Sequence, residues 1–131
     1  MKTVIFDLDG TISDPKEGIV QSLNYALVAH GFEVQPENEL AKYIGPPLDS
    51  TFKAITHSDN TELILSLVAK YRERYSDVGF SENIIYSGIR ETLEQLSAIS
   101  GITLGICTSK RTDFAERILD MFNLKQYFSF V

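Results

Sequence analysis

The residues from Met1 to Thr11 constrain the fold more than any other part of this 131-residue chain. The apolar run Val4-Ile5-Phe6 leads directly into Asp7-Leu8-Asp9-Gly10-Thr11. A continuous β-branched and aromatic run that ends in a glycine turn is typical of a central strand covered on both faces. In open α/β sheets, ligands bind just beyond the carboxyl ends of the strands. The sequence therefore predicts an α/β fold with two carboxylates at a strand end, although a helix cap or a turn could also explain these acids.

A second strand-to-helix turn lies in the last third of the chain. Residues 102 to 107 alternate large and small side chains, which predicts a second buried strand with Cys107 as a small core residue. Right-handed crossover connections place this strand parallel to the first. It ends in Thr108-Ser109-Lys110, where phosphate recognition and simple helix capping both account for the residues. Phe128 to Val131 is predicted to begin a third strand.

Between these two pieces the sequence has the periodicity of helices. Apolar residues recur at spacings of three and four, and Gly and Pro separate the runs. We predict a compact helical domain over residues 15–80, inserted into an α/β core formed by residues 1–14 and 81–131. The helices expected in the insertion are residues 15–30, residues 36–44, a helix from Leu48 that ends near residues 57–60, and about residues 61–76, and a further core helix follows Gly88.

Composition excludes several classes of protein. The hydrophobic content of 44% is typical of a globular chain. A formal net charge of −6 argues against nucleic acid or an anionic membrane as the main partner, because both attract basic surfaces. The single cysteine is consistent with a reducing compartment. The N-terminus matches neither a signal peptide nor a membrane span, so we expect a cytoplasmic protein.

The string Asp7-Leu8-Asp9-Gly10-Thr11 resembles the first motif of the haloacid dehalogenase superfamily of phosphohydrolases. The resemblance implies that Asp7 is the nucleophile, Asp9 the general acid and base, and that Gly10 and Thr11 lie against the phosphoryl group. An aspartate that attacks phosphorus divides one difficult displacement into two easier ones. The family also implies Mg²⁺, held by the Asp7 carboxylate and the Asp9 main-chain carbonyl. Magnesium favours such hard oxygen ligands and retains water.

Thr108-Ser109-Lys110 stands where the second motif of the superfamily falls. The resemblance assigns the Thr108 hydroxyl and the Ser109 amide to the transferring phosphoryl group. Lys110 is then either a nearby counter-charge or a surface lysine.

The resemblance is closest to the phosphoglycolate phosphatase-like branch, which has a helical cap after the first motif. In that branch a loop such as Gly45-Pro46-Pro47 faces the substrate, and a plain helix break is the alternative. Arg72 and Arg74 are candidates to meet a substrate anion, although the solvated face of a helix is the more ordinary explanation. The implied activity is Mg²⁺-dependent hydrolysis of a small phosphorylated metabolite through an aspartyl-phosphate.

The chain departs from the family pattern at its C-terminal end. Neither the lysine of the third motif nor the acids of the fourth can be placed, and Lys125 does not match the lysine position. Only three strands of the expected sheet are present, which leaves Val4-Ile5-Phe6 as an apolar edge open to pairing. We therefore expect the N-terminal portion of a phosphatase of roughly 200 residues, nearly inactive in isolation.

Other functions remain open from the sequence. The same aspartyl-phosphate chemistry serves nucleotide phosphatases and sugar phosphomutases. A receiver-type signalling domain also combines strand-end acids with Thr and Lys, but its connections are too short for this helical insertion. A chain without catalysis that binds phosphate or a partner through the sheet edge is a third class.

Overall fold

The computed structural model describes all residues from Met1 to Val131, and the chain divides into two compact units. Unit 1 consists of Met1–Pro15 together with Asn83–Val131. Unit 2 is the intervening segment, Lys16–Glu82. The first unit is therefore built from two segments that are far apart in the sequence.

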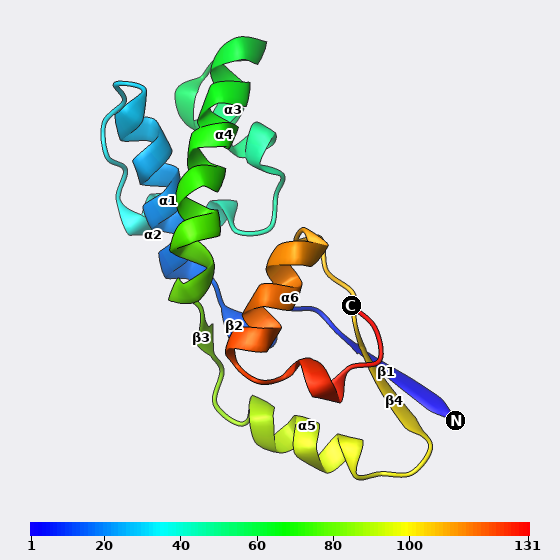
Figure 1. Ribbon diagram of the computed structural model, residues 1–131. Coiled ribbons are helices and arrows are strands. Elements are labelled where there is room, and N and C mark those ends of the chain that lie inside the picture. Colours follow the sequence, from blue (N-terminus) through cyan, green and yellow to red (C-terminus); the bar gives the residue numbers. More distant parts are fainter. The chain divides into compact units, whose positions relative to one another are not determined.

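The sheet of unit 1 is parallel. Strand β1 (Lys2–Phe6) pairs with β4 (Ile102–Ile106) in register from one end to the other, and Figure 1 shows the two strands side by side. On the other side of β4, the Ser129 amide donates to the Leu104 carbonyl at 2.8 Å and the Ile106 amide donates to the Phe130 carbonyl at 3.0 Å. These bonds add a short third segment, which bridges Phe130 to Gly105 in parallel. The predicted α/β fold class with a parallel core is confirmed.

The prediction that the first strand is covered on both faces is wrong for this chain. Lys2, Thr3 and Ile5 are exposed, and Ile5 keeps 57% of its side-chain surface accessible. The edge of the sheet beyond β1 is open, as the sequence also predicted, because β4 is the only strand that pairs with β1. Ile5 therefore lacks the neighbouring side chains that a further strand would supply. Cys107 was expected in the core, yet it is also exposed. Strand β4 ends one residue earlier, at Ile106, so Cys107 belongs to the following loop.

Two helices complete the α/β part of unit 1. Helix α5 spans Ile89–Ser97 and α6 spans Thr112–Met121, and the 3₁₀ turn η3 (Lys125–Tyr127) follows. Each helix buries one apolar face, as amphipathic helices on a sheet do. The fully or almost fully buried side chains on these two helices are Leu93, Phe114, Ala115, Ile118 and Leu119.

A short antiparallel ribbon in unit 1 was not predicted. It pairs β2 (Ser13–Asp14) with β3 (Ile84–Ile85), and the Ser13 hydroxyl donates to Asn83 Oδ1 at 3.1 Å. Both ribbon strands adjoin the points where the chain enters and leaves unit 2. Strands of two residues have no periodicity that a sequence pattern could detect.

Unit 2 is entirely helical. Its elements are α1 (Lys16–Ala29), α2 (Glu37–Leu40), η1 (Ala41–Tyr43), α3 (Leu48–Thr56), α4 (Thr61–Asp77) and η2 (Gly79–Glu82). Helix α4 begins where the periodicity predicts, with the Asn60 side chain accepting from the Leu63 amide at 3.1 Å. None of the helices combines the length and apolar character needed to cross a bilayer. The core of the unit is formed by Leu23, Leu27, Phe52, Leu67 and Tyr71.

Helix α1 packs directly against the chain that leaves α4. An ideal Cβ placed on Gly18 would lie 2.1 Å from the Gly79 carbonyl oxygen, so only glycine permits this approach. Arg74 holds the same region by two hydrogen bonds to Glu82, at 2.7 and 3.2 Å, and a third to the Ser22 hydroxyl at 3.1 Å. This half-buried contact joins α1, α4 and the end of unit 2.

Candidate active site

The loop after β1 is a tight turn around one carbonyl oxygen. The amides of residues 11, 12 and 13 all donate to the Leu8 carbonyl, at 3.2, 2.9 and 3.3 Å. The Leu8 and Ile12 side chains are completely buried and anchor the loop in the core. Gly10 has a φ of +82°, a left-handed conformation that favours glycine over other residues. The loop is therefore a rigid support for the two aspartates that flank Leu8.

The two aspartates lie in different environments although they are only two residues apart. Asp7 is exposed, and its Oδ1 accepts the amide hydrogen of Leu8 at 2.7 Å. Asp9 is largely buried, with 19% of its side-chain surface accessible. Burial raises the pKa of the Asp9 carboxyl; nearby Lys110 lowers it, and Asp7 adds a smaller increase. One carboxylate is thus open to solvent, while the other has an increased tendency to hold a proton.

The loop after β4 lies beside the loop after β1. The Cys107 amide donates to the Phe6 carbonyl at 2.9 Å, which extends the pairing of the strands by one bond. Within the loop, the Thr108 hydroxyl accepts the Lys110 amide hydrogen at 3.2 Å. Ser109 is exposed. The predicted second-motif residues therefore occupy a strand-to-helix turn directly before α6.

An ion pair joins the two loops. Lys110 Nζ lies 3.1 Å from Asp9 Oδ2, and only 9% of the lysine side-chain surface is accessible. Lys110 is therefore not the surface lysine that the sequence left open as an alternative. The other carboxylate oxygen, Asp9 Oδ1, is buried without a hydrogen-bond partner. Sequence reasoning placed Lys110 in the site but missed its pairing with Asp9.

The oxygen ligands near Asp7 could hold a magnesium ion only together with further ligands. No group of three or more His, Cys, Asp or Glu side chains in the chain is arranged to hold a metal. Asp7 nevertheless offers an exposed carboxylate, and the main-chain carbonyl of Asp9, two residues further on, is the second oxygen that the family resemblance assigns to the ion. Hard oxygen donors of this kind suit Mg²⁺, which keeps several water ligands.

The residues predicted to meet the substrate from the helical insertion lie in unit 2. Gly45, Pro46 and Pro47 are exposed and form a loop directly before α3. Arg72 is exposed on α4. Arg74, the other arginine considered, is bound to Glu82 and is therefore charge-compensated within its own unit.

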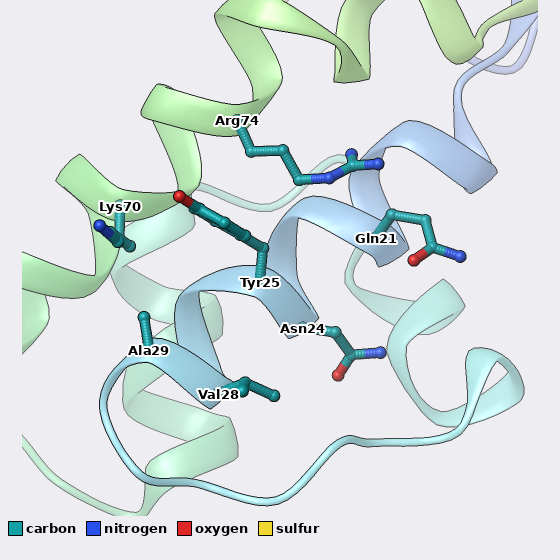
Figure 2. A pocket seen from close by; sticks show the side chains of 7 residues that line it. All are labelled: Gln21, Asn24, Tyr25, Val28, Ala29, Lys70 and Arg74. Atoms are coloured by element: carbon teal, nitrogen blue, oxygen red, sulfur yellow. The ribbon is translucent and has the colours of Figure 1, made fainter.

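A hollow of about 480 Å³ lies between α1 and α4 within unit 2. Figure 2 shows Tyr25 and Lys70 near one end and Arg74 and Gln21 near the other. Its cations already have acidic partners, since Lys70 lies 3.1 Å from Glu73 and Arg74 is bound to Glu82. We therefore do not assign an anion site to this hollow.

The family of the chain is established by comparison with known proteins. The family model described as haloacid dehalogenase-like hydrolase matches residues 4–131. The chain therefore belongs to the haloacid dehalogenase-like hydrolases, as the motif at Asp7 and Asp9 predicted. The crystal structure of a "predicted phosphatase" from Clostridium acetobutylicum has a similar fold, with a TM-score of 0.88 at 36% identity over 98% of this chain and 59% of that one.

Curated relatives have several different names. A tyrosine-protein kinase, PtkA, of Mycobacterium tuberculosis is 39% identical over 98% of this chain and 43% of its own length. A 5'-nucleotidase of Pseudomonas aeruginosa is 38% identical over 95% of this chain and 56% of its own length. A phosphoglycolate phosphatase of Agrobacterium fabrum is 34% identical, with 95% and 55% covered. The chain thus spans about half the length of the curated relatives that it matches.

Proposed function

We propose that this chain supplies the nucleophile and the general acid and base of a Mg²⁺-dependent phosphomonoester hydrolase. The observation that carries the proposal is the pair of strand-end aspartates, one exposed and one buried against Lys110. Membership of the haloacid dehalogenase-like hydrolases supports it. The substrate class that we propose is a small phosphorylated metabolite handled in the cytoplasm.

In the first step, a carboxylate oxygen of Asp7 attacks phosphorus, and the bond from phosphorus to the leaving oxygen breaks. Asp9 donates a proton to that oxygen, so the substrate leaves as a neutral alcohol. In the second step, Asp9 accepts a proton from water as the water oxygen attacks phosphorus. The bond from phosphorus to Asp7 then breaks, which regenerates the carboxylate and releases inorganic phosphate.

The remaining site residues bind the transferring group in this proposal. The Thr108 hydroxyl and the Ser109 amide, together with Gly10 and Thr11, would contact the phosphoryl oxygens. The Asp7 carboxylate and the Asp9 main-chain carbonyl would hold Mg²⁺, which supplies charge neutralisation at the phosphoryl group. We propose that the other metal ligands, and the lysine of the third motif, lie outside these 131 residues.

We propose unit 2 as a cap over the substrate, with the core formed by residues 1–14 and 81–131. The Gly45-Pro46-Pro47 loop and Arg72 are the candidate substrate contacts, because both are exposed. A lid that closes over a site excludes bulky substrates, which favours a small metabolite over a protein.

A nucleotide phosphatase is the second candidate. It is favoured by the 38% identity to a 5'-nucleotidase. The core chemistry is the same, so only the groups that contact the leaving alcohol distinguish it from a hydrolase of smaller metabolites. A protein named as a tyrosine kinase matches 98% of this chain, so similarity in this part of the sequence does not by itself distinguish between the activities named for the relatives.

The proposal is tested by assaying the full-length protein with Mg²⁺ and a panel of phosphomonoesters that includes phosphoglycolate and nucleoside monophosphates. Asp7→Asn is expected to reduce turnover at least ~10³-fold, because the amide is a much weaker nucleophile. Asp113→Asn is the matched control, since that carboxylate is exposed and pairs with Arg111. Full activity in Asp7→Asn, or turnover that is unaffected by EDTA, would contradict the proposal.

A further inference from the structure

The geometry points to Lys110 as a positioning residue that acts through Asp9, rather than as a ligand of the phosphoryl group. This inference rests on the proposed function and makes it more specific. It starts from the ion pair of 3.1 Å between Lys110 Nζ and Asp9 Oδ2, which joins the loops that follow β1 and β4.

Burial supports this role. A ligand of an incoming phosphate needs a free ammonium group, whereas Lys110 Nζ is paired with Asp9 Oδ2 at 3.1 Å and only 9% of the lysine side-chain surface is accessible. The backbone explains why the ammonium group is directed inward. The Lys110 amide is bound to the Thr108 hydroxyl, and Cys107 is bound to Phe6, so the lysine starts from a turn that is fixed beside β1.

The second carboxylate oxygen of Asp9 shows that the orientation of this side chain depends on Lys110. Asp9 Oδ1 has no hydrogen-bond partner, so Lys110 is the one side chain that fixes the rotation of this carboxyl group. A buried carboxylate without a partner is unfavourable, because burial removes the water that solvates its charge. Loss of the lysine is therefore expected to move or reorient Asp9, while Asp7 and the phosphate-binding turn remain in place.

Leaving-group dependence separates the two roles of Lys110. An alkyl phosphate requires a proton on its leaving oxygen, whereas p-nitrophenyl phosphate has a leaving group that departs as the anion. Loss of a general acid therefore lowers kcat/KM for the alkyl substrate much more than for the aryl substrate. Loss of a phosphate ligand lowers kcat/KM for both substrates by a similar factor, because both share the phosphoryl group.

We would measure kcat/KM of the full-length protein with glycerol phosphate and with p-nitrophenyl phosphate. Lys110→Met is expected to lower the value for glycerol phosphate about 10- to 100-fold and the value for the aryl substrate only severalfold. Lys110→Arg should recover most of the loss, since it keeps a cation. Lys125→Met is the matched control, because the Lys125 side chain is 45% exposed and makes only weak ion pairs. Its Nζ lies 4.0 Å from the nearest acidic oxygens, which is too far for a hydrogen bond.

Two further measurements exclude a purely structural effect. Asp9→Asn combined with Lys110→Met should be no slower than Asp9→Asn alone, because the lysine acts through that carboxyl group. The inhibition constant of inorganic phosphate should change less than about threefold in Lys110→Met. If this variant does not fold, Lys110→Gln serves for the same comparison.

Equal losses for both substrates, with weaker inhibition by phosphate, would overturn the inference and make Lys110 a phosphoryl ligand. Unchanged rates for both substrates would overturn it as well. Failure of the proposed function is recognised separately, from wild-type protein that has no Mg²⁺-dependent turnover or from turnover that survives in Asp7→Asn.

Discussion

At the scale of single residues, burial distinguishes two aspartates that the sequence presents as near equals. Asp7 is exposed at the end of β1, while Asp9 is packed against Lys110 and lies next to the buried Leu8. Burial is also the main reason that the pKa of Asp9 rises. An exposed carboxylate and a buried carboxyl group that tends to hold its proton are suited to different chemical roles. The fold of the loop therefore gives the two carboxyl groups environments that match the roles of nucleophile and general acid that we propose for them.

The raised pKa of Asp9 predicts how stability depends on pH without metal. Asp9 titrates above its ordinary value of 3.8 in the folded state, so the folded state retains a proton that the unfolded state has lost. Protonated Asp9 is favoured by the folded state, so the contribution of Asp9 to the free energy of unfolding is fully present below pH 3.8. This contribution is lost as the pH rises through the folded-state pKa and the buried carboxyl group becomes charged. Asp9→Asn lacks this titration.

Urea unfolding of the full-length protein and of Asp9→Asn, in EDTA at several pH values, checks this prediction. The free energy of unfolding of the wild type, minus that of the variant, should decrease as the pH rises above 3.8. A difference that stays constant or increases would show that Asp9 is not destabilised as a buried charge.

At the scale of elements, most helices follow from local periodicity, but their contacts depend on a few small residues. Helix α1 carries Gly18, a poor helix former, at a buried position. The Gly79 carbonyl explains this choice, because any side chain on Gly18 would collide with it. Nearby, Arg74 binds both Ser22 and Glu82 and holds the end of unit 2 to the two long helices.

Gly18→Ala is predicted to destabilise the protein despite the higher helix propensity of alanine. The gain in propensity is about 1 kcal/mol, whereas forcing a methyl group into a packed backbone contact costs about 1–3 kcal/mol and occasionally more. With the new Cβ only 2.1 Å from Gly79 O, we expect the clash to prevail. The measurement is the midpoint of urea unfolding.

Gln21→Ala provides the control for that measurement. Gln21 is an exposed residue of the same helix, so its replacement should change the unfolding free energy by less than about 0.5 kcal/mol. If Gly18→Ala were as stable as this control, the close approach of α1 to Gly79 would not be required in solution.

At the scale of the whole molecule, the sheet has an open edge. Strand β1 has one strand partner, and Ile5 is 57% exposed. An exposed apolar edge strand presents unpaired amide and carbonyl groups to other chains. The chain also spans only 43% to 56% of three curated relatives. We therefore expect the isolated 131 residues to self-associate through this edge of the sheet.

Self-association through β1 is tested by placing a charge on the open strand. Ile5→Lys is expected to shift the isolated chain toward monomer, because a charged edge disfavours pairing between strands. Sedimentation over a range of protein concentrations provides the measurement. Leu65→Lys is the control, since Leu65 is 64% exposed but lies on a helix of unit 2. Equal effects of the two substitutions would exclude the strand edge as the site of association.

The local structure and the residue types of the candidate site follow from the amino-acid sequence. Apolar periodicity, together with Gly and Pro at the breaks, predicted the long helices, the two long strands and the strand-end position of Asp7 and Asp9, because these features depend on neighbouring residues. The three-dimensional structure was needed to show that a short β2–β3 ribbon forms, that Cys107 is exposed and that Lys110 binds Asp9. The physical reason is that burial and ion pairing depend on segments about 100 residues apart, whose approach no local pattern encodes.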